Sequence, residues 1–221
     1  MHAFDSIIFT VYMLKLIQPM QITDQGLSMN RILSTVLILL IMSTAVLADD
    51  KHEAQQIVKN KLDAVFAVLN QQDIDQQAKK KEVDAIVTPM FDFELMAKLT
   101  LGKKYWPDLS EEKRARYIQL YINRLKTSYL DKLTLYTDEK VVFEPPVQVQ
   151  KKVQIPTQLV SKERRTSILY KLYKSDEAWK VYDLEIQGVS IIRSYRSQFY
   201  EILQKGTIDD LLKKLEKPAN T

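Results

Sequence analysis

The sequence predicts an α+β fold with helices at both ends and an antiparallel sheet of about four strands between them. Apolar residues recur at helical spacing from 49 to 129, and they alternate with polar residues over much of 141–186. Helical spacing returns after Ser190. Because the helices flank the block of strands instead of alternating with them, the order indicates α+β and not α/β.

Three helices are expected at the start of the folded chain. The first covers 49–69, where apolar side chains recur every three or four residues. A more polar second helix covers 74–87 and stops at Pro89, because proline cannot continue a helix. The third covers 91–102 and ends at Gly102, a residue type that commonly caps helices.

A fourth helix of more than about 20 residues is expected after Ser110. Ser110 is a suitable N-cap, and Glu111 and Glu112 fall in the first turn, where the helix dipole favours acidic groups. Ser110 and Lys113 also fit the S-x-x-K pattern of serine hydrolases. The partner motifs of that pattern are missing, so we interpret Ser110 as a helix cap.

Four strands are expected next, over 141–143, 147–155, 166–173 and 179–186. In the second strand, valine and isoleucine alternate with glutamine and lysine, which indicates one buried and one wet face. A Ser-Asp-Glu segment at 175–177 favours a hairpin turn between the last two strands.

Two helices are expected to close the fold. Gly188 lets the chain reverse sharply after the last strand, and Ser190 can cap the helix that follows. This helix ends at Gly206. Thr207 and Asp210 resemble a capping box for the final helix.

Residues 29–48 have the layout of a secretory signal peptide. Arg31 supplies the positive charge, an apolar run of 16 residues extends from Ile32 to Leu47, and small residues precede a cleavage point after Ala48. The run is shorter than the roughly 20 apolar residues that span a bilayer. We therefore expect export with cleavage, and an uncleaved membrane helix is the alternative.

Residues 1–28 fit no targeting pattern, and we expect them to be an upstream mis-assigned start, with Met29 as the true one. Residues 49–221 would then form a single domain, large enough to bury a real core. The sequence contains no cysteine, so this fold does without disulfides and the lipid attachment of a bacterial lipoprotein is not expected.

The net charge of +4, from 32 basic and 28 acidic residues, indicates a surface that carries both signs of charge and not a strong electrostatic field of one sign. The short basic clusters at 79–81, 151–152 and 164–165 are typical of solvated faces, with weak attraction to anionic head groups as the alternative. Arg193 and Arg196 could bind a phosphate group or lie on the solvent-exposed face of their helix. No nucleic-acid partner is expected.

The folded part of the sequence offers few groups for catalysis. Its one histidine, His52, lies at the expected N-terminus, and its glycines are too far apart to form a phosphate-binding loop. Asp183 and Glu185 lie two apart on a strand, where they could do acid–base work, but surface or hydrogen-bonding roles are commoner. We therefore expect no enzyme, no cofactor and no metal.

One stretch, WKVYDLEIQGVSIIRSYRSQFYEIL, joins a strand to a helix through a glycine turn. The strand begins at Trp179 and reaches Tyr182-Asp183, the turn is Gly188-Val189-Ser190, and the helix carries Tyr195-Arg196-Ser197-Gln198-Phe199. This stretch resembles the C-terminal signature of the MlaC / toluene-tolerance family. Upstream, FDFELMAKLTLGKKYW and the long helix that follows are similar to the Phe-Asp-Phe, Leu-Gly and Trp pattern of the family.

The resemblance covers residues 74–215, departs around 160–165 and has no counterpart for 1–28. It implies an α+β domain whose sheet and helices enclose an apolar pocket, and a soluble periplasmic carrier of phospholipids without catalysis. It also implies two partners, an inner-membrane ABC transporter complex and an outer-membrane lipoprotein complex, with lipid traffic that maintains outer-membrane asymmetry. The carrier is expected to be a monomer.

Helical and strand spacing, read with this resemblance, gives ten candidate lipid-binding residues. They are Met96, Tyr117, Tyr121, Ile168, Tyr170, Tyr182, Val189, Ile192, Tyr195 and Phe199. Sequence alone does not distinguish a packed core from a pocket, because both need the same apolar side chains. Two alternatives stay open at this point: a carrier or chaperone for another hydrophobic cargo, and a small enzyme on a similar scaffold.

Overall fold

The structure of the protein is a computed structural model that describes residues 50–130, 139–162, 164–175 and 178–218. The expected signal peptide (29–48) and the expected upstream start (1–28) lie outside these residues. Within the described part of the chain, no helix is long and apolar enough to cross a membrane.

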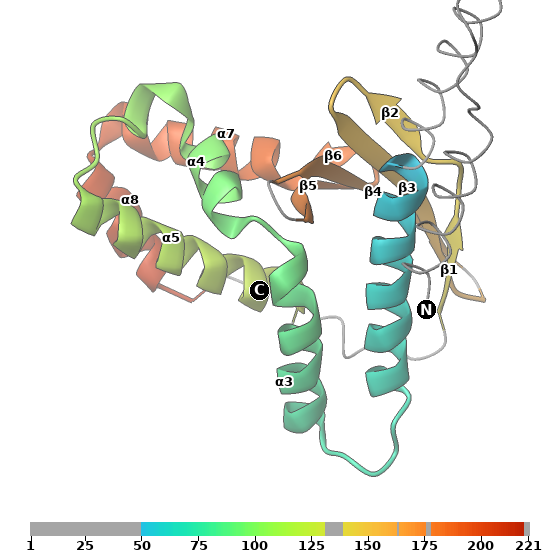
Figure 1. The fold of residues 1–221 in the computed structure, drawn as a ribbon. Helices are drawn as coiled ribbons and strands as arrows, with labels where there is room; N and C mark the ends of the chain where they lie inside the picture. The colour runs from blue at the N-terminus through green and yellow to red at the C-terminus, as the bar shows by residue number, and fades with distance from the viewer. Residues whose placement is uncertain (1–49, 131–138, 163, 176–177, 219–221) are drawn as a thin grey trace, which may run out of the picture. The chain divides into compact units, whose positions relative to one another are not determined.

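Helices form most of the described chain (Figure 1). They are helix 50–69, α3 (Gln76–Val87), the 3-10 turn η1 (Thr88–Met90), α4 (Phe93–Tyr105), α5 (Glu111–Leu125), the π-helical turn η2 (Lys126–Leu130), α7 (Ile191–Lys205) and α8 (Ile208–Glu216).

Side-chain caps start these helices where the sequence predicts them. The Ser110 hydroxyl accepts the N–H of Lys113 at 3.3 Å and caps α5, which confirms the structural interpretation of this serine. Thr207 and Asp210 form the expected capping box of α8.

One helix boundary matches the sequence prediction and another differs from it. Gly102 has a non-helical φ of 78°, so the first helical segment of α4 ends there as predicted, and a second short segment continues to Tyr105. The long helix after Ser110 ends as an α-helix at Leu125 and continues as the π-helical turn η2. Apolar spacing continues through Tyr129, so the pattern could not distinguish a π-helical turn from an α-helix.

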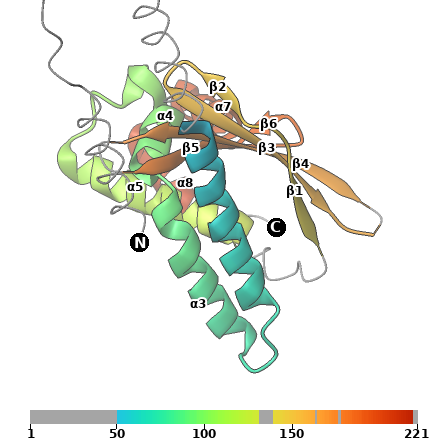
Figure 2. The same cartoon turned by 45° about the vertical axis from the view of Figure 1, so that its right-hand side comes forward.

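Six antiparallel strands form one sheet (Figure 2). They are β1 (Lys140–Phe143), β2 (Val147–Val149), β3 (Lys152–Val160), β4 (Arg165–Lys174), β5 (Trp179–Ile186) and β6 (Val189–Ser190). The order is β1-β3-β4-β5-β6, and β2 pairs with another part of β3. The α+β class is confirmed, with six strands in place of the expected four.

The two additional strands arise from tight turns. Residues 147–155 form a hairpin and not one strand, because Val149 pairs with Lys152 across a turn in which Gln150 has a φ of 56°. No glycine or asparagine marks that turn, so the alternation on either side resembled one strand. The second turn, at Gln187 and Gly188, has positive φ at both residues and pairs β5 with β6, as Gly188 predicts.

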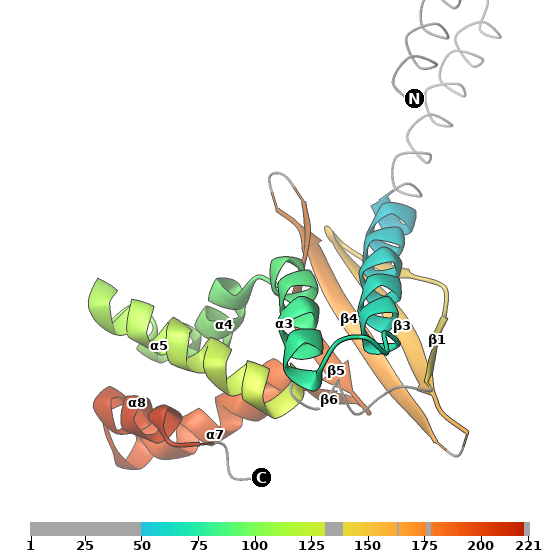
Figure 3. The same ribbon diagram turned by 90° about the horizontal axis from the view of Figure 1, so that it is seen from below.

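Three apolar clusters hold these elements together. Helix 50–69 packs on one face of β3, β4 and β5 through Ala54 and Val58. Farther along, the same helix packs against α3 around Val83, and the buried Lys79 donates to the Leu69 carbonyl at 2.8 Å. The third cluster joins α4, α5, α7 and α8, which gather away from helix 50–69 (Figure 3).

Candidate functional site

A cavity of about 270 Å³ lies between the sheet and the helices that cover it. Its wall comes from helix 50–69, α3, η1, α4, the α5–η2 junction, four strands and the start of α7. The lining residues are Leu62, Val65, Phe66, Leu69, Asp84, Val87, Thr88, Met90, Phe91, Phe93, Met96, Leu125, Lys126, Tyr129, Val141, Thr157, Leu159, Thr166, Ile168, Tyr170, Leu184, Ile186 and Ile191. Most of these side chains are hydrocarbon.

Strand alternation and one bulge decide which sheet residues reach the cavity. Ile168 and Tyr170 are two apart on β4 and therefore share a face. On β5, Val181 pairs with Leu172 and Asp183 pairs with Lys171, so Tyr182 is an extra residue. This bulge reverses the alternation of β5, and Leu184 and Ile186 join the cavity face after it.

The polar groups in the sheet wall are neutral or already paired. The Thr157 hydroxyl donates to the Ile168 carbonyl at 2.9 Å, within the β3–β4 pairing. Burial raises the pKa of Tyr170 well above its ordinary value, so its hydroxyl stays protonated at neutral pH. This wall of the cavity therefore presents no net charge to a ligand.

The first turn of α4 brings helical residues to the cavity. The Asp92 side chain accepts the Leu95 N–H at 2.8 Å and caps α4, while the Asp92 N–H donates to the Val181 carbonyl at 2.9 Å. The Tyr173 hydroxyl also bonds to Asp92. These contacts fix the start of α4 to the sheet and place Met96 at the cavity wall.

Of the ten candidate residues, the structure brings three together at the cavity. Met96, Ile168 and Tyr170 line it. Ile192 is buried in the helical cluster, and it is the preceding residue, Ile191, that lines the cavity.

Four aromatic candidates lie elsewhere, packed against one another among α4, α5, α7 and α8. We call this group, Tyr117, Tyr121, Tyr195 and Phe199, the aromatic core. The rings of Tyr117 and Tyr121 stack with centroids 6.0 Å apart, and Phe199 meets both edge-on. None of the four lines the cavity.

The remaining two candidates lie on the outside of the sheet region. Val189 is 60% exposed in β6. Tyr182, the bulged residue of β5, packs edge-on against Tyr173, and the Lys152 ammonium lies 4.3 Å from its ring centroid. Neither side chain lines the cavity, and a role in lipid binding for these two stays a prediction.

Sequence reasoning missed most of the cavity wall. Helix 50–69 contributes Leu62, Val65, Phe66 and Leu69, all of which lie on the apolar stripe that predicted this helix. The stripe is long enough to serve two purposes, since Ala54 packs on the sheet while the later turns border the cavity. Periodicity predicts that the whole stripe is buried, but it does not show which of its residues pack on the sheet and which border a cavity.

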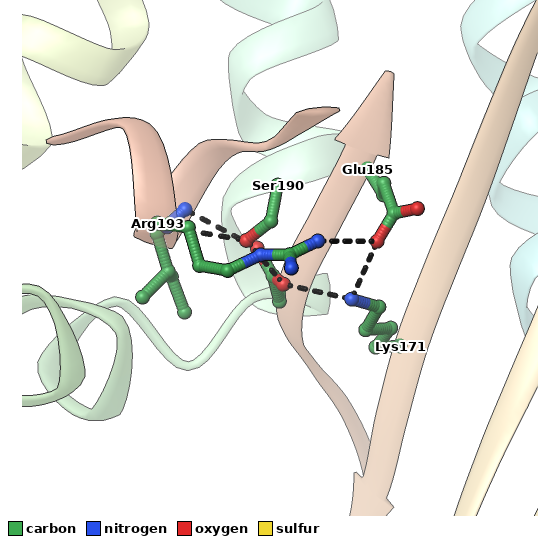
Figure 4. A network of polar contacts seen from close by, with 6 residues as sticks. Lys171, Glu185, Ser190 and Arg193 are labelled. Atoms are coloured by element: carbon green, nitrogen blue, oxygen red, sulfur yellow. Dashed lines mark hydrogen bonds and ion pairs between the residues drawn. The ribbon is translucent and has the colours of Figure 1, made fainter. Parts of the chain in front are cut away.

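The join between strand and helix is a polar clamp around Asp183, which is 5% exposed (Figure 4). Its carboxylate accepts the Ser190 hydroxyl at 2.8 Å and the Ile192 N–H at 3.3 Å. The Ser190 oxygen accepts the Arg193 N–H at 3.2 Å and caps α7. A carboxylate also suits the positive end of the helix dipole, so the clamp fixes α7 to β5.

Three further charged side chains, Lys171, Glu185 and Arg193, complete this clamp. Lys171 Nζ lies 2.8 Å from Glu185 Oε2 and 3.2 Å from Asp183 Oδ2, and Arg193 approaches the same Glu185 oxygen at 3.4 Å (Figure 4). Burial lowers the pKa of Lys171, but the bonds and charges of Glu185 and Asp183 outweigh this and raise it. Both carboxylates are therefore ion-paired, and neither lines the cavity.

Other groups considered from the sequence also have structural partners. The Arg196 guanidinium donates to the carbonyl of Leu99 on α4, with Nε at 3.0 Å. Across the described ranges, no three histidine, aspartate or glutamate side chains are grouped so that they could hold a metal ion.

The largely hydrocarbon cavity between the sheet and the helices offers a surface suited to an apolar ligand. The MlaC protein family model matches residues 59–217, which span nearly all the described helices and strands. The chain belongs to the MlaC family, which confirms the resemblance in the C-terminal stretch.

Two comparisons agree with this assignment. The chain is 25% identical over 138 residues to the intermembrane phospholipid transport system binding protein MlaC of Haemophilus influenzae, covering 60% of this chain and 64% of that protein. It is also similar in fold to a phospholipid-binding protein from Ralstonia solanacearum, whose structure was solved in complex with a phospholipid. That match has a TM-score of 0.68 and 23% identity, and covers 74% of this chain and 95% of the other.

Proposed function

We propose that the protein is a soluble periplasmic carrier that shuttles phospholipid between outer-membrane and inner-membrane transport complexes and so maintains outer-membrane lipid asymmetry. The observation that carries this proposal is the cavity between the sheet and the helices, with its hydrocarbon wall. The names of the two relatives support the cargo: one belongs to an intermembrane phospholipid transport system, and the other holds a phospholipid.

The physical need for such a carrier follows from the cost of exposing acyl chains to water. A phospholipid has on the order of 30 methylenes, each costing about 0.8 kcal/mol on transfer to water. The upper estimate is therefore more than about 20 kcal/mol, and free diffusion across an aqueous compartment is negligible. A carrier has to cover the tails with apolar side chains and can leave the head group in water.

The cavity supplies such a surface, although at 270 Å³ it is smaller than the roughly 300–1,000 Å³ of typical ligand sites. Two acyl chains would have to widen it. Its wall includes Met90 and Met96, whose flexible side chains repack readily. Tail entry in the proposed carrier is accompanied by rearrangement of these side chains.

The placement of the carboxylates considered for catalysis argues against enzyme activity. The carboxylate pair of the sequence, Asp183 and Glu185, is bound to Lys171 in the clamp and does not reach the cavity. Transport in the proposed cycle is therefore driven by the relative lipid affinities of the two membrane complexes or by energy that a partner supplies.

Extraction of the purified exported protein, followed by native mass spectrometry, tests the proposed cargo. We expect stoichiometric phospholipid, and uptake of phospholipid from vesicles after delipidation. A protein that stays free of lipid after incubation with vesicles would contradict the proposal. Recovery of a quinone or sterol-like molecule in place of phospholipid would favour the alternative of another hydrophobic cargo.

A pair of neighbouring β4 variants tests the site. In Ile168→Trp the indole fills part of the cavity, and displacing about two methylenes of lipid costs about 1.6 kcal/mol, roughly a 15-fold loss of affinity. Leu169→Trp places the same group on the opposite face of the strand, so uptake from vesicles should match that of the wild type. Equal losses in both variants would show that the cavity face has no special part in binding.

A further inference from the structure

Two charged side chains lie at the edge of the otherwise apolar cavity. Among the described residues that line it, Asp84 and Lys126 are the only acidic and basic side chains. Lys126 Nζ lies 2.7 Å from Asp84 Oδ1 and 3.0 Å from Oδ2, and the Thr88 hydroxyl donates to Oδ1 at 2.9 Å. The two side chains are 29% and 37% exposed, so the pair lies where the cavity meets solvent.

The position of this pair follows from the fold. Asp84 is in the last turn of α3 and Thr88 begins η1, so both face the same edge of the cavity. Lys126 is the first residue of η2, where the α-helical spacing of α5 ends. The neighbours Val87, Leu125 and Tyr129 continue the apolar wall on either side of the charges.

A brace between α3 and η2 is a weak explanation for these charges. Partly exposed ion pairs contribute about 0–1 kcal/mol to stability. The chain on either side of the pair already borders the cavity through the partly buried Val87 of α3 and the buried Leu125 at the end of α5. An ionised pair beside a hydrocarbon cavity is, in contrast, well placed to meet the polar end of a ligand whose tails lie inside.

We propose that Asp84 and Lys126 form a head-group site that favours a zwitterionic phospholipid, with Lys126 facing the phosphate and Asp84 facing the ammonium group. This inference rests on the proposed function, since it requires acyl chains in the cavity. The pair separates as the head group arrives, and each side chain exchanges its protein partner for the lipid group of opposite charge. Every charge keeps a partner, so the exchange leaves no ion unpaired.

An anionic head group without an ammonium does not allow this exchange. Lys126 can pair with its phosphate, but Asp84 then loses its cation and lies beside a like charge. The hydrogen bond from the Thr88 hydroxyl is then the one contact left to Asp84 among those described for the pair. The site therefore discriminates between phosphatidylethanolamine and phosphatidylglycerol carrying the same acyl chains. The expected preference is about three- to fivefold, the range of a partly exposed ion pair.

Competition between these two lipids tests the head-group site. Delipidated full-length processed protein is incubated with vesicles of equimolar phosphatidylethanolamine and phosphatidylglycerol, and the bound lipids are extracted and quantified. We expect Asp84→Asn to shift the bound ratio about three- to fivefold toward phosphatidylglycerol, because it removes the anion that repels phosphate. Lys126→Gln should shift the ratio the opposite way, because only the ammonium lipid still offers Asp84 a partner.

The Lys113–Asp209 pair provides a matched control. It joins α5 to α8 with a separation of 2.8 Å and does not line the cavity. Asp209→Asn removes the same charge and should leave the lipid ratio unchanged. Equal ratios in the wild type and all three variants, with lipid bound in each, would overturn the head-group site and leave the carrier proposal standing. A wild type that takes up neither lipid would instead overturn the carrier proposal and this inference with it.

Discussion

The aromatic core and the cavity wall are both buried and apolar, but they are built from different side chains. In the aromatic core, Tyr117 and Tyr121 are 0% exposed and their rings meet Phe199 edge-on at 6.2 and 6.5 Å. The cavity wall is mainly aliphatic, with Leu, Ile, Val and Met side chains from helices on one side and strands on the other.

This difference separates a packed scaffold from the wall of an open apolar cavity. Flat rings in edge-on and stacked contact pack α4, α5, α7 and α8 against one another. The sheet and helix 50–69 enclose a space that their side chains do not fill. If the proposed function holds, an apolar residue contributes mainly to stability in the first region and mainly to ligand affinity in the second.

Removing a ring from the aromatic core should have the largest effect on stability. We expect Phe199→Ala to lower the free energy of unfolding by about 3–5 kcal/mol, because Phe199 is 4% exposed and its loss leaves a cavity. Urea denaturation followed by circular dichroism measures this. Phe199→Leu should lose less and stay folded, with lipid uptake per molecule close to the wild type. If the lipid affinity of Phe199→Leu fell as much as that of Ile168→Trp, the aromatic core and the cavity wall would not differ in function.

A smaller effect is expected from two stacked tyrosines that differ in their hydrogen bonds. The Tyr121 and Thr100 hydroxyls lie 3.1 Å apart, whereas the buried Tyr117 hydroxyl has no hydrogen-bond partner among the described residues. Tyr121→Phe should therefore cost about 1 kcal/mol, and Tyr117→Phe should be neutral or slightly stabilising. Thermal and urea unfolding of the two variants, which lose the same atom, provide the comparison. A larger loss in Tyr117→Phe would show that this hydroxyl has a partner after all.

The smallest effect concerns the attachment of helix 50–69 to the sheet. Glu53 bonds to Lys174 at 3.0 Å and to the Trp179 indole at 3.0 Å, and these bonds lower the pKa of Glu53 below its ordinary 4.5. A carboxyl group whose pKa is lowered by folding stabilises the protein at pH values above its pKa in the unfolded state. This stabilisation is lost as the pH falls through its pKa in the folded state.

The lowered pKa of Glu53 predicts how the stability lost in Glu53→Gln depends on pH. At pH 7 the variant should be less stable by under about 1 kcal/mol, since Glu53 is largely exposed. The gap between variant and wild type should close below about pH 4.5 in urea unfolding. Asp63→Asn, in the exposed Lys59–Asp63 pair of the same helix, is the control. A gap that widens on acidification would contradict the assignment.

Local rules predicted much of the fold from the sequence. Ser110, Ser190 and the Thr207–Asp210 box mark helix starts because capping is a contact within one turn. Gly188 marks a turn because few other residues adopt its positive φ. The hairpin at Gln150 lacked such a residue, and it was read as a continuous strand.

The site was harder to predict because a cavity is the absence of packing between distant elements. Helical spacing identified Tyr117 and Tyr121 as buried, which is correct, but burial is common to both regions. Ile168 and Tyr170 were placed at the wall by strand alternation, whereas Leu184 and Ile186 depend on the bulge at Tyr182. The paired charges of Asp84 and Lys126 lie 42 residues apart, and no local pattern connects them.

Photo-cross-linking with a phospholipid that carries a diazirine in its acyl chain shows where the tails lie in the loaded protein. After uptake from vesicles and irradiation, peptide mapping locates the residues that contact the tail. The cavity account predicts adducts on Leu62–Leu69 of helix 50–69 and on the β4 and β5 segments around Ile168 and Ile186. Adducts concentrated on Tyr117 and Tyr121, with the cavity wall unlabelled, would show that the aromatic core opens to hold the lipid and that the cavity does not.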